Sequence, residues 1–158
     1  MSAARKQGEG KRARGPLKEK KKRTWLMPQE VEVWYVLPAI RRELTKVMIE
    51  KGIAQKQIAS MLGVTEPAIT QYKLEKSSRS RGDQITIPRE ILPEIERAAE
   101  TMIAAWDKKA EMKELYETMT REINRIIRLL RDSGALCDIH RSHCEHVDEE
   151  CDACKSKS

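Results

Sequence analysis

Residues 55–74 constrain the fold of this chain more than any other part of its sequence. Six apolar or small positions fit two short helices that pack across one tight turn: Ile58, Ala59, Leu62, Val64, Ile69 and Tyr72. Gly63 stands where the first helix should end, a place that usually takes the left-handed conformation that glycine reaches without strain. Thr65 can cap the second helix through the amide of Ala68, because Pro67 has no N–H. The run predicts a helix-turn-helix, with an ordinary αα-hairpin as the alternative.

The second helix of such a unit can lie in the major groove of DNA. If its apolar residues point inward, the outward positions are Thr65, Glu66, Pro67, Thr70, Gln71 and Leu74. Gln71 is the best candidate for a bidentate contact to adenine, Thr70 can meet a thymine methyl or a phosphate, and Glu66 can accept from a cytosine amino group. Four basic residues are better placed for phosphates: Lys73, Lys76, Arg79 and Arg81. Each residue can instead be an ordinary solvated side chain.

A longer segment carries a specific resemblance to a known family. The stretches concerned are Leu37-Pro-Ala-Ile-Arg-Arg-Glu-Leu, Gly52-Ile-Ala-Gln-Lys-Gln-Ile-Ala and Leu62-Gly-Val-Thr-Glu-Pro-Ala-Ile-Thr-Gln-Tyr. They resemble the lambda-repressor-like (XRE-type) helix-turn-helix, and more narrowly a group of predicted archaeal transcriptional regulators. The resemblance covers residues 27–82 and implies sequence-specific binding to double-stranded DNA. Ala54 departs from the family, which commonly places a capping serine there, and a lost cap costs about 1 kcal/mol.

The residues before this motif leave two local structures open. Residues 30–35 alternate between apolar and acidic or aromatic side chains, which fits a short strand, but they also fit a short helix that ends before Pro38. From Pro38 onward the pattern is helical, with apolar residues at three- and four-residue spacing up to Gly52. Arg41, Arg42 and Lys46 are expected to point away from the apolar face of this helix. The apolar face of this helix is the natural floor for the helix-turn-helix.

Length and charge set further limits. A chain of 158 residues holds one ordinary domain with appendages or two small ones, and without phenylalanine its core depends on Ile, Leu, Met and Ala. No apolar stretch is long enough for a membrane span and no hydrophobic signal region begins the chain, so we expect a cytoplasmic, nucleoid-associated protein. The net charge is +6, yet residues 1–23 alone hold ten Lys or Arg against two Glu. We expect a disordered basic arm that follows DNA phosphates, or else a solubilising tail or localisation signal.

Amphipathic helical spacing returns from about Arg89 to Arg131, after a brief extended link with Ile85 and Ile87 on one side. Two helices fit the pattern, and so does one long helix that is broken at Asp107-Lys-Lys. They can cover the core of the same domain or form a dimer interface, since a lone helix with an apolar stripe needs a partner surface. We favour a homodimer, because two copies can grip two DNA half-sites.

All cysteines and histidines of the chain lie within 18 residues: Cys137, His140, His143, Cys144, His146, Cys151 and Cys154. Such crowding in an intracellular protein indicates a metal site rather than a disulfide framework. Cys137-x2-His140 with Cys151-x2-Cys154 has the spacing of a structural zinc site. The four cysteines, with Cys144, can alternatively bind an iron–sulfur cluster. Thiol–disulfide sensing and a tail without function are further alternatives.

These patterns divide the chain into a basic arm (1–24), a helix-turn-helix DNA-binding domain (25–82), a helical dimerisation region (83–133) and a Cys/His-rich segment (134–158). The expected fold is all-α. The expected function is that of a sequence-specific transcriptional regulator whose zinc or iron–sulfur centre is structural or sensory. No acid/base or nucleophile constellation stands beside the cysteines, so we do not expect an enzyme. A metal-dependent redox protein and an antitoxin-like module that binds another protein are the alternatives.

Overall fold

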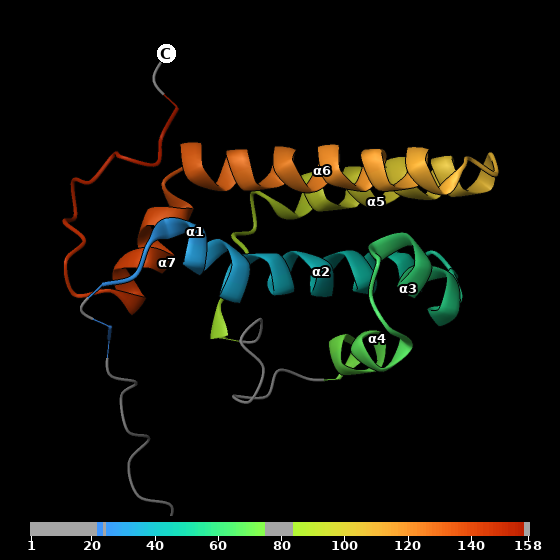
Figure 1. Ribbon diagram of the computed structural model, residues 1–158, viewed down its shortest axis with the longest axis horizontal. Coiled ribbons are helices and arrows are strands. Elements are labelled where there is room, and N and C mark those ends of the chain that lie inside the picture. Colours follow the sequence, from blue (N-terminus) through green and yellow to red (C-terminus); the bar gives the residue numbers. More distant parts are fainter. Residues whose placement is uncertain (1–21, 24, 75–83, 157–158) are drawn as a thin grey trace, which may run out of the picture.

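The computed structural model describes residues 22–23, 25–74 and 84–156, and in these ranges the fold is all-α, as expected (Figure 1). The elements are α1 (Pro28–Val31), the π-helical turn η1 (Glu32–Val36), α2 (Leu37–Glu50), α3 (Gln55–Leu62), α4 (Glu66–Lys73), α5 (Leu92–Asp107), α6 (Met112–Asp132) and α7 (Ala135–His143). The described β pairing is a single isolated bridge between Arg23 and Cys144. No helix in these ranges has the length and apolarity needed to cross a membrane.

Residues 28–50 form one continuous helical rod, so the strand considered for residues 30–35 is wrong. A strand would place Val31 and Val33 on the same face, yet Val31 is buried and Val33 is 60% exposed. Pro38 does not end the helix either. Proline lacks an N–H and its ring crowds the carbonyl four residues back, a conflict that a wider turn relieves. In η1 the amide of Leu37 bonds the carbonyl oxygen of Glu32, five residues back, and the helix continues.

Two short helices follow at the predicted positions. Gly63 ends α3 in the left-handed conformation, with φ of +63°, and the Thr65 hydroxyl accepts from the Ala68 amide at 3.3 Å. Ala54, at the start of α3, makes no side-chain cap. Helix α4 packs against both α2 and α3, and Ile69 on its inner side is fully buried. The turn residues and the apolar spacing therefore act as the sequence predicts.

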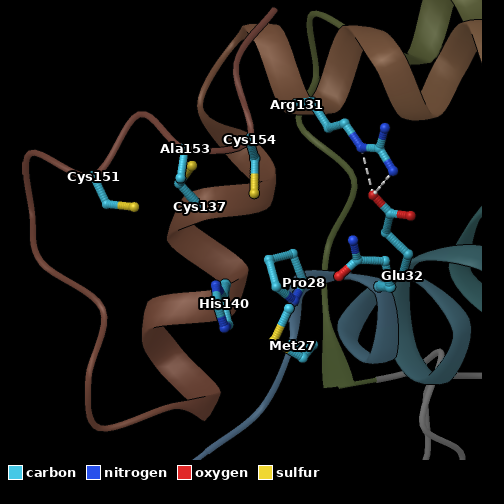
Figure 2. A pocket seen from close by; sticks show the side chains of 10 residues that line it. Met27, Pro28, Glu32, Arg131, Cys137, His140, Cys151, Ala153 and Cys154 are labelled. Carbon is cyan, nitrogen blue, oxygen red and sulfur yellow. Dashed lines mark hydrogen bonds and ion pairs between the residues drawn. The ribbon is translucent and has the colours of Figure 1, made fainter.

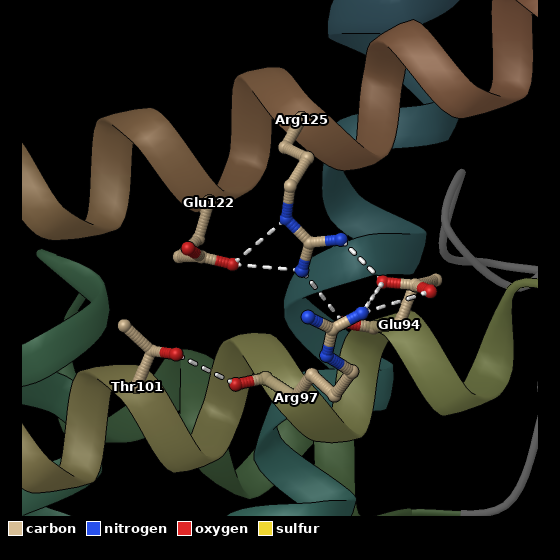
Figure 3. Close-up of polar contacts among 5 residues, drawn as sticks. All are labelled: Glu94, Arg97, Thr101, Glu122 and Arg125. Carbon is tan, nitrogen blue, oxygen red and sulfur yellow. Dashed lines mark hydrogen bonds and ion pairs between the residues drawn. The ribbon is translucent and has the colours of Figure 1, made fainter.

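Helices α5 and α6 form an antiparallel hairpin that lies along α2 (Figure 1). The region is thus two helices, and their apolar stripes meet within one chain at Ile95, Ala98, Ala99, Met102, Ile123, Ile126 and Leu130. At one edge Arg125 of α6 bonds Glu122 at 2.8 Å and reaches Glu94 of α5, both the carboxylate and, at 3.1 Å, the carbonyl oxygen (Figure 3). The stripes assigned to a dimer interface in the sequence are therefore used largely for the chain's own core. Large apolar residues outside it include Met112 and Tyr116, 65% and 64% exposed.

The C-terminal segment folds back against the start of the rod. Gly134 turns the chain between α6 and α7 with φ of +84°, and α7 packs against both α6 and α1. Arg131 near the end of α6 bonds the carboxylate of Glu32 at 2.6 Å, which joins α6 to η1. The extended link before α5 buries Ile85 and Ile87, as its alternation predicts.

Candidate functional site

The outer side of α4 presents every predicted DNA-facing residue that the structure describes. These exposed residues are Thr65, Glu66, Pro67, Thr70, Gln71, Lys73 and Leu74. Ile69 is buried on the opposite side and Tyr72 is half-buried, so the orientation of the helix is the predicted one. Lys76, Arg79 and Arg81 lie outside the described residues.

Gln55, at the first position of α3, was not among the predicted site residues but reaches the outer side of α4. Its side-chain amide donates to the Thr70 hydroxyl at 2.6 Å and to the carbonyl oxygen of Glu66 at 3.1 Å. The Thr70 hydroxyl in turn donates to the same carbonyl at 3.3 Å. These bonds fix the hydroxyl of Thr70 and tie the starts of the two helices together. A glutamine at the N-terminus of the first helix was the available sequence signal.

Arg42 of α2 holds the other end of α4. It was expected to face away from the apolar side of its helix, yet it is 4% exposed and donates to the carbonyl oxygen of Leu74 at 2.9 Å. Leu74 caps the C-terminus of α4, where the helix dipole favours a cation. The helix with the exposed face is therefore fastened at both ends and buried along its inner side, which gives it one fixed orientation.

A second candidate site is a pocket of about 450 Å³ between α1, α7 and the chain after α7, called here the α7 pocket (Figure 2). Its lining residues are Met27, Pro28, Gln29, Glu32, Arg131, Cys137, His140, Cys151, Ala153 and Cys154. Cys137 and His140 are one turn apart on α7, and Cys151 and Cys154 approach from the loop. All four residues of one of the two predicted ligand sets therefore line this pocket, and they are called here the Cys3His set: Cys137, His140, Cys151 and Cys154.

Cys144 does not join this pocket. Its side chain is 4% exposed within the hydrophobic core, and its backbone forms the bridge to Arg23. The four-cysteine set considered for an iron–sulfur cluster is therefore not brought together. Among residues 22–23, 25–74 and 84–156, no three Cys, His, Asp or Glu side chains are already close enough to hold a metal ion.

The thiol of Cys154 is influenced electrostatically by its surroundings in the α7 pocket. Burial raises the pKa of the Cys154 thiol, and the nearby thiols of Cys137 and Cys151 raise it further, while Arg131 opposes the rise. A raised pKa keeps the thiol protonated near neutral pH, whereas a bound cation would favour the thiolate. The pKa of Cys154 therefore depends on its burial and on the charged and thiol groups that line the same pocket.

The side chains of all three histidines contact residues in or just before the first turns of the helical rod. The Nε2 atom of His140 is hydrogen-bonded to the carbonyl oxygen of Leu26. The ring of His143 lies 4.2 Å from that of Tyr35, and the ring of His146 lies 5.1 Å from that of Trp25. The His146 ring therefore packs on the segment that precedes α1, the His143 ring packs on η1, and among the three histidines His140 lines the pocket.

The backbone adds two hydrogen bonds to this docking. The amide of Arg23 donates to the carbonyl oxygen of His143, and the amide of Glu145 donates to the carbonyl oxygen of Arg23, each at 3.0 Å. Arg23 also places its guanidinium 4.7 Å from the ring centre of Trp34.

In comparisons with known proteins, the chain matches no protein-family model, no curated protein and no solved structure.

Proposed function

We propose that this chain is a sequence-specific DNA-binding transcriptional regulator that inserts α4 into the major groove, in the manner of the XRE-type proteins that residues 27–82 resemble. One observation carries the proposal. Those predicted DNA-facing residues that the structure describes share one exposed side of a short helix whose other side is buried against α2 and α3. Direct readout of bases needs this combination of an accessible polar face and a fixed helix.

The way α4 is held supports this function. Ile69 is buried beneath it, Thr65 caps its first turn, and Arg42 bonds the carbonyl oxygen of Leu74 at its end. Side chains on a rigid element can meet base edges with little loss of conformational entropy. Gln71 is exposed and would make a bidentate contact to adenine through its amide. Thr70 is exposed too, and with its hydroxyl bonded to Gln55 it would meet a thymine methyl group through its own methyl group.

A homodimer is part of the proposal, because a single α4 contacts few base pairs and two copies would contact two half-sites. The α5–α6 stripe is mostly buried in its own chain, so contact between copies would use other surface. Met112 and Tyr116, one turn apart on α6, are exposed and suit this role. Sedimentation of the full chain with and without bound DNA measures the stoichiometry. One chain per bound duplex would contradict this part of the proposal.

The experiment selects bound sequences from a random duplex DNA pool with the full chain, and then compares two alanine variants. Thr70→Ala removes an exposed hydroxyl that bonds the carbonyl four residues back, and Thr101→Ala on α5 removes the same intrahelical bond. We expect the wild-type chain and Thr101→Ala to enrich one motif and Thr70→Ala to enrich it less. Absence of any enriched motif, or equal loss in both variants, would contradict the function.

A further inference from the structure

We propose that the Cys3His set binds one zinc ion in the α7 pocket, and that this ion fastens residues 22–23 and 25–27 to α7. The inference does not depend on DNA binding by α4. It starts from the pocket itself, where residues from α7 and from the following loop line one space (Figure 2).

The available donors favour zinc over an iron–sulfur cluster. Iron–sulfur clusters are generally held by four thiolates, and the fourth cysteine of this chain, Cys144, is buried in the core and outside the pocket. Three thiolates and one imidazole make a tetrahedral set that is common for structural zinc. Glu32 also lines the pocket, but its carboxylate is paired with Arg131 at 2.6 Å, so it is already bonded.

The hydrogen bond of His140 leaves one ring nitrogen for the metal. A carbonyl oxygen can only accept, so the bond to Leu26 requires a hydrogen on Nε2. In the neutral ring Nδ1 then carries the lone pair. Metal-bound histidines usually donate their other N–H to a carboxylate or a backbone carbonyl, which fixes the tautomer and the ring orientation. His140 has this arrangement before any metal binds.

The site would close when the ion binds. In the described part of the chain the donors are gathered but not yet within bonding distance of one point. Cys151 and Cys154 lie in a loop, where the Cys151 amide bonds the Asp148 carbonyl and the Lys155 amide bonds the Asp152 carbonyl. Such a loop can move toward α7 without breaking a helix. Zinc thiolate sites commonly form together with the binding of the ion.

The charges in the pocket suit this ion. Three thiolates and Zn²⁺ leave one net negative charge, and Arg131 lines the same pocket. The ion would therefore let the three thiols bind as thiolates without leaving a large net charge at the site.

The ion would also strengthen the docking of the segment that precedes α1. A metal on Nδ1 withdraws electron density from the ring, so Nε2–H becomes a better donor to the carbonyl of Leu26. The same segment is held by the backbone pairing of Arg23 with His143 and Glu145. Zinc at the pocket thus acts on the residues that connect the N-terminal basic stretch to the helical rod.

The first experiment measures metal in the full chain, purified under reducing conditions without oxygen. We expect one zinc per chain, and after exchange for Co²⁺ a thiolate charge-transfer band with the visible bands of a four-coordinate ion. Cys151→Ser and Cys154→Ser should each weaken zinc binding strongly and reduce the charge-transfer band by about a third. Cys144→Ala is the matched control and should keep the metal.

Circular dichroism checks that each variant is folded. The two serine variants alter a loop and should therefore keep the helix content of the wild-type chain. Iron with labile sulfide in the purified chain would overturn the zinc assignment. So would zinc that survives in the chain carrying both Cys151→Ser and Cys154→Ser, called here the double serine variant. Zinc lost from a folded Cys144→Ala chain, or a reduced wild-type chain that fails to bind added Zn²⁺, would overturn it too.

The second experiment tests the docking of residues 22–23 and 25–27 by limited digestion with trypsin, followed by mass spectrometry. Cleavage after Lys22 and Arg23 should be several-fold slower with zinc than without it in the wild-type chain. The double serine variant should be cut at one rate in both conditions. Equal cleavage of the wild-type chain with and without bound zinc would overturn the coupling, whereas a negative DNA-selection result would leave this inference unchanged.

Discussion

The guanidinium of Arg42 on α2 lies 2.9 Å from the carbonyl oxygen of Leu74, so a buried cation holds the last turn of α4 in place. A backbone carbonyl at the end of a helix has no partner within the helix, and the dipole makes it a strong acceptor for a cation. One side chain therefore both satisfies this group and sets the position of the helix that we propose enters DNA.

Replacing Arg42 by methionine should destabilise the fold and weaken DNA binding together. The change removes a charged hydrogen bond and leaves a carbonyl without it, which we expect to lower the free energy of unfolding by about 1–3 kcal/mol. Urea unfolding measures the first effect and gel shift the second. Arg128→Met, at an exposed position on α6, is the control and should change both by little. Equal stability of the two variants would contradict the role of Arg42.

Gln71→Ala should remove base discrimination while keeping the fold. We expect specific binding to weaken by about 1–3 kcal/mol and binding to unrelated DNA to change little, because the lost contact is to a base edge. Titration of both duplexes at one salt concentration provides the measurement. Equal losses on the two duplexes would mean that Gln71 does not read bases.

The basic stretch should contribute to affinity through phosphates. Removing residues 1–21 takes away eight Lys or Arg and leaves the docked residues from 22 onward in place. We expect a less steep dependence of log affinity on log salt, with the base preference unchanged. An arm of equal length made of glycine and serine is the control and should behave like the deletion. An unchanged salt slope would leave residues 1–21 without a role in DNA binding.

The ion pair between α5 and α6 should make stability depend on pH. The hydrogen bond from Arg125 holds the pKa of Glu94 below its ordinary value of 4.5, and Arg97 lowers it further (Figure 3). A carboxyl group whose pKa is lowered in the folded state stabilises the fold at pH values above its ordinary pKa. This stabilisation is lost as the pH falls through the lowered pKa. Wild-type protein should therefore lose part of its advantage over Glu94→Gln in this acidic range.

Urea midpoints measured between pH 7 and pH 3 test this expectation. Glu100→Gln is the control, because Glu100 forms a more exposed pair with Lys51 at 3.3 Å and should matter less at pH 7. A gap between wild type and Glu94→Gln that stays constant over the whole range would show that the carboxylate charge is not responsible.

Local chemistry predicted the helices around α4 well. The freedom of Gly63 and the cap of Thr65 on Ala68 depend on residues within a few positions, and the structure has both. Arg42 could not be placed in this way, since its partner is a carbonyl 32 positions along the chain. Single-helix periodicity reports which side of a residue's own helix is polar, and it carries no information about which other element needs a cation.

The candidate metal site was predictable only in part for a similar reason. Spacing identified the pairs Cys137-x2-His140 and Cys151-x2-Cys154, because each pair lies within one turn. It did not separate Cys144 from the others, since that separation comes from the backbone pairing of Cys144 with Arg23 at the opposite end of the chain. The apolar stripes of α5 and α6 were likewise predictable from their spacing. That the two stripes pack against each other within one chain could not be predicted from that spacing.

The wide turn η1 has a consequence for how the rod uses its surface. Buried positions along one side are Val31, Val36, Ile40 and Leu44, so the first step is five residues where the later steps are four. An unbroken α-helix through the same sequence would rotate Val31 by about 100° relative to Leu44. The wide turn accommodates the extra residue and keeps the buried side chains on one side of the rod. This allows a single helix to pack α1 against α7 and α2 against α5. Removing one residue from 32–36 would leave a four-residue step, which an ordinary α-helical turn accommodates while both packing faces stay in place.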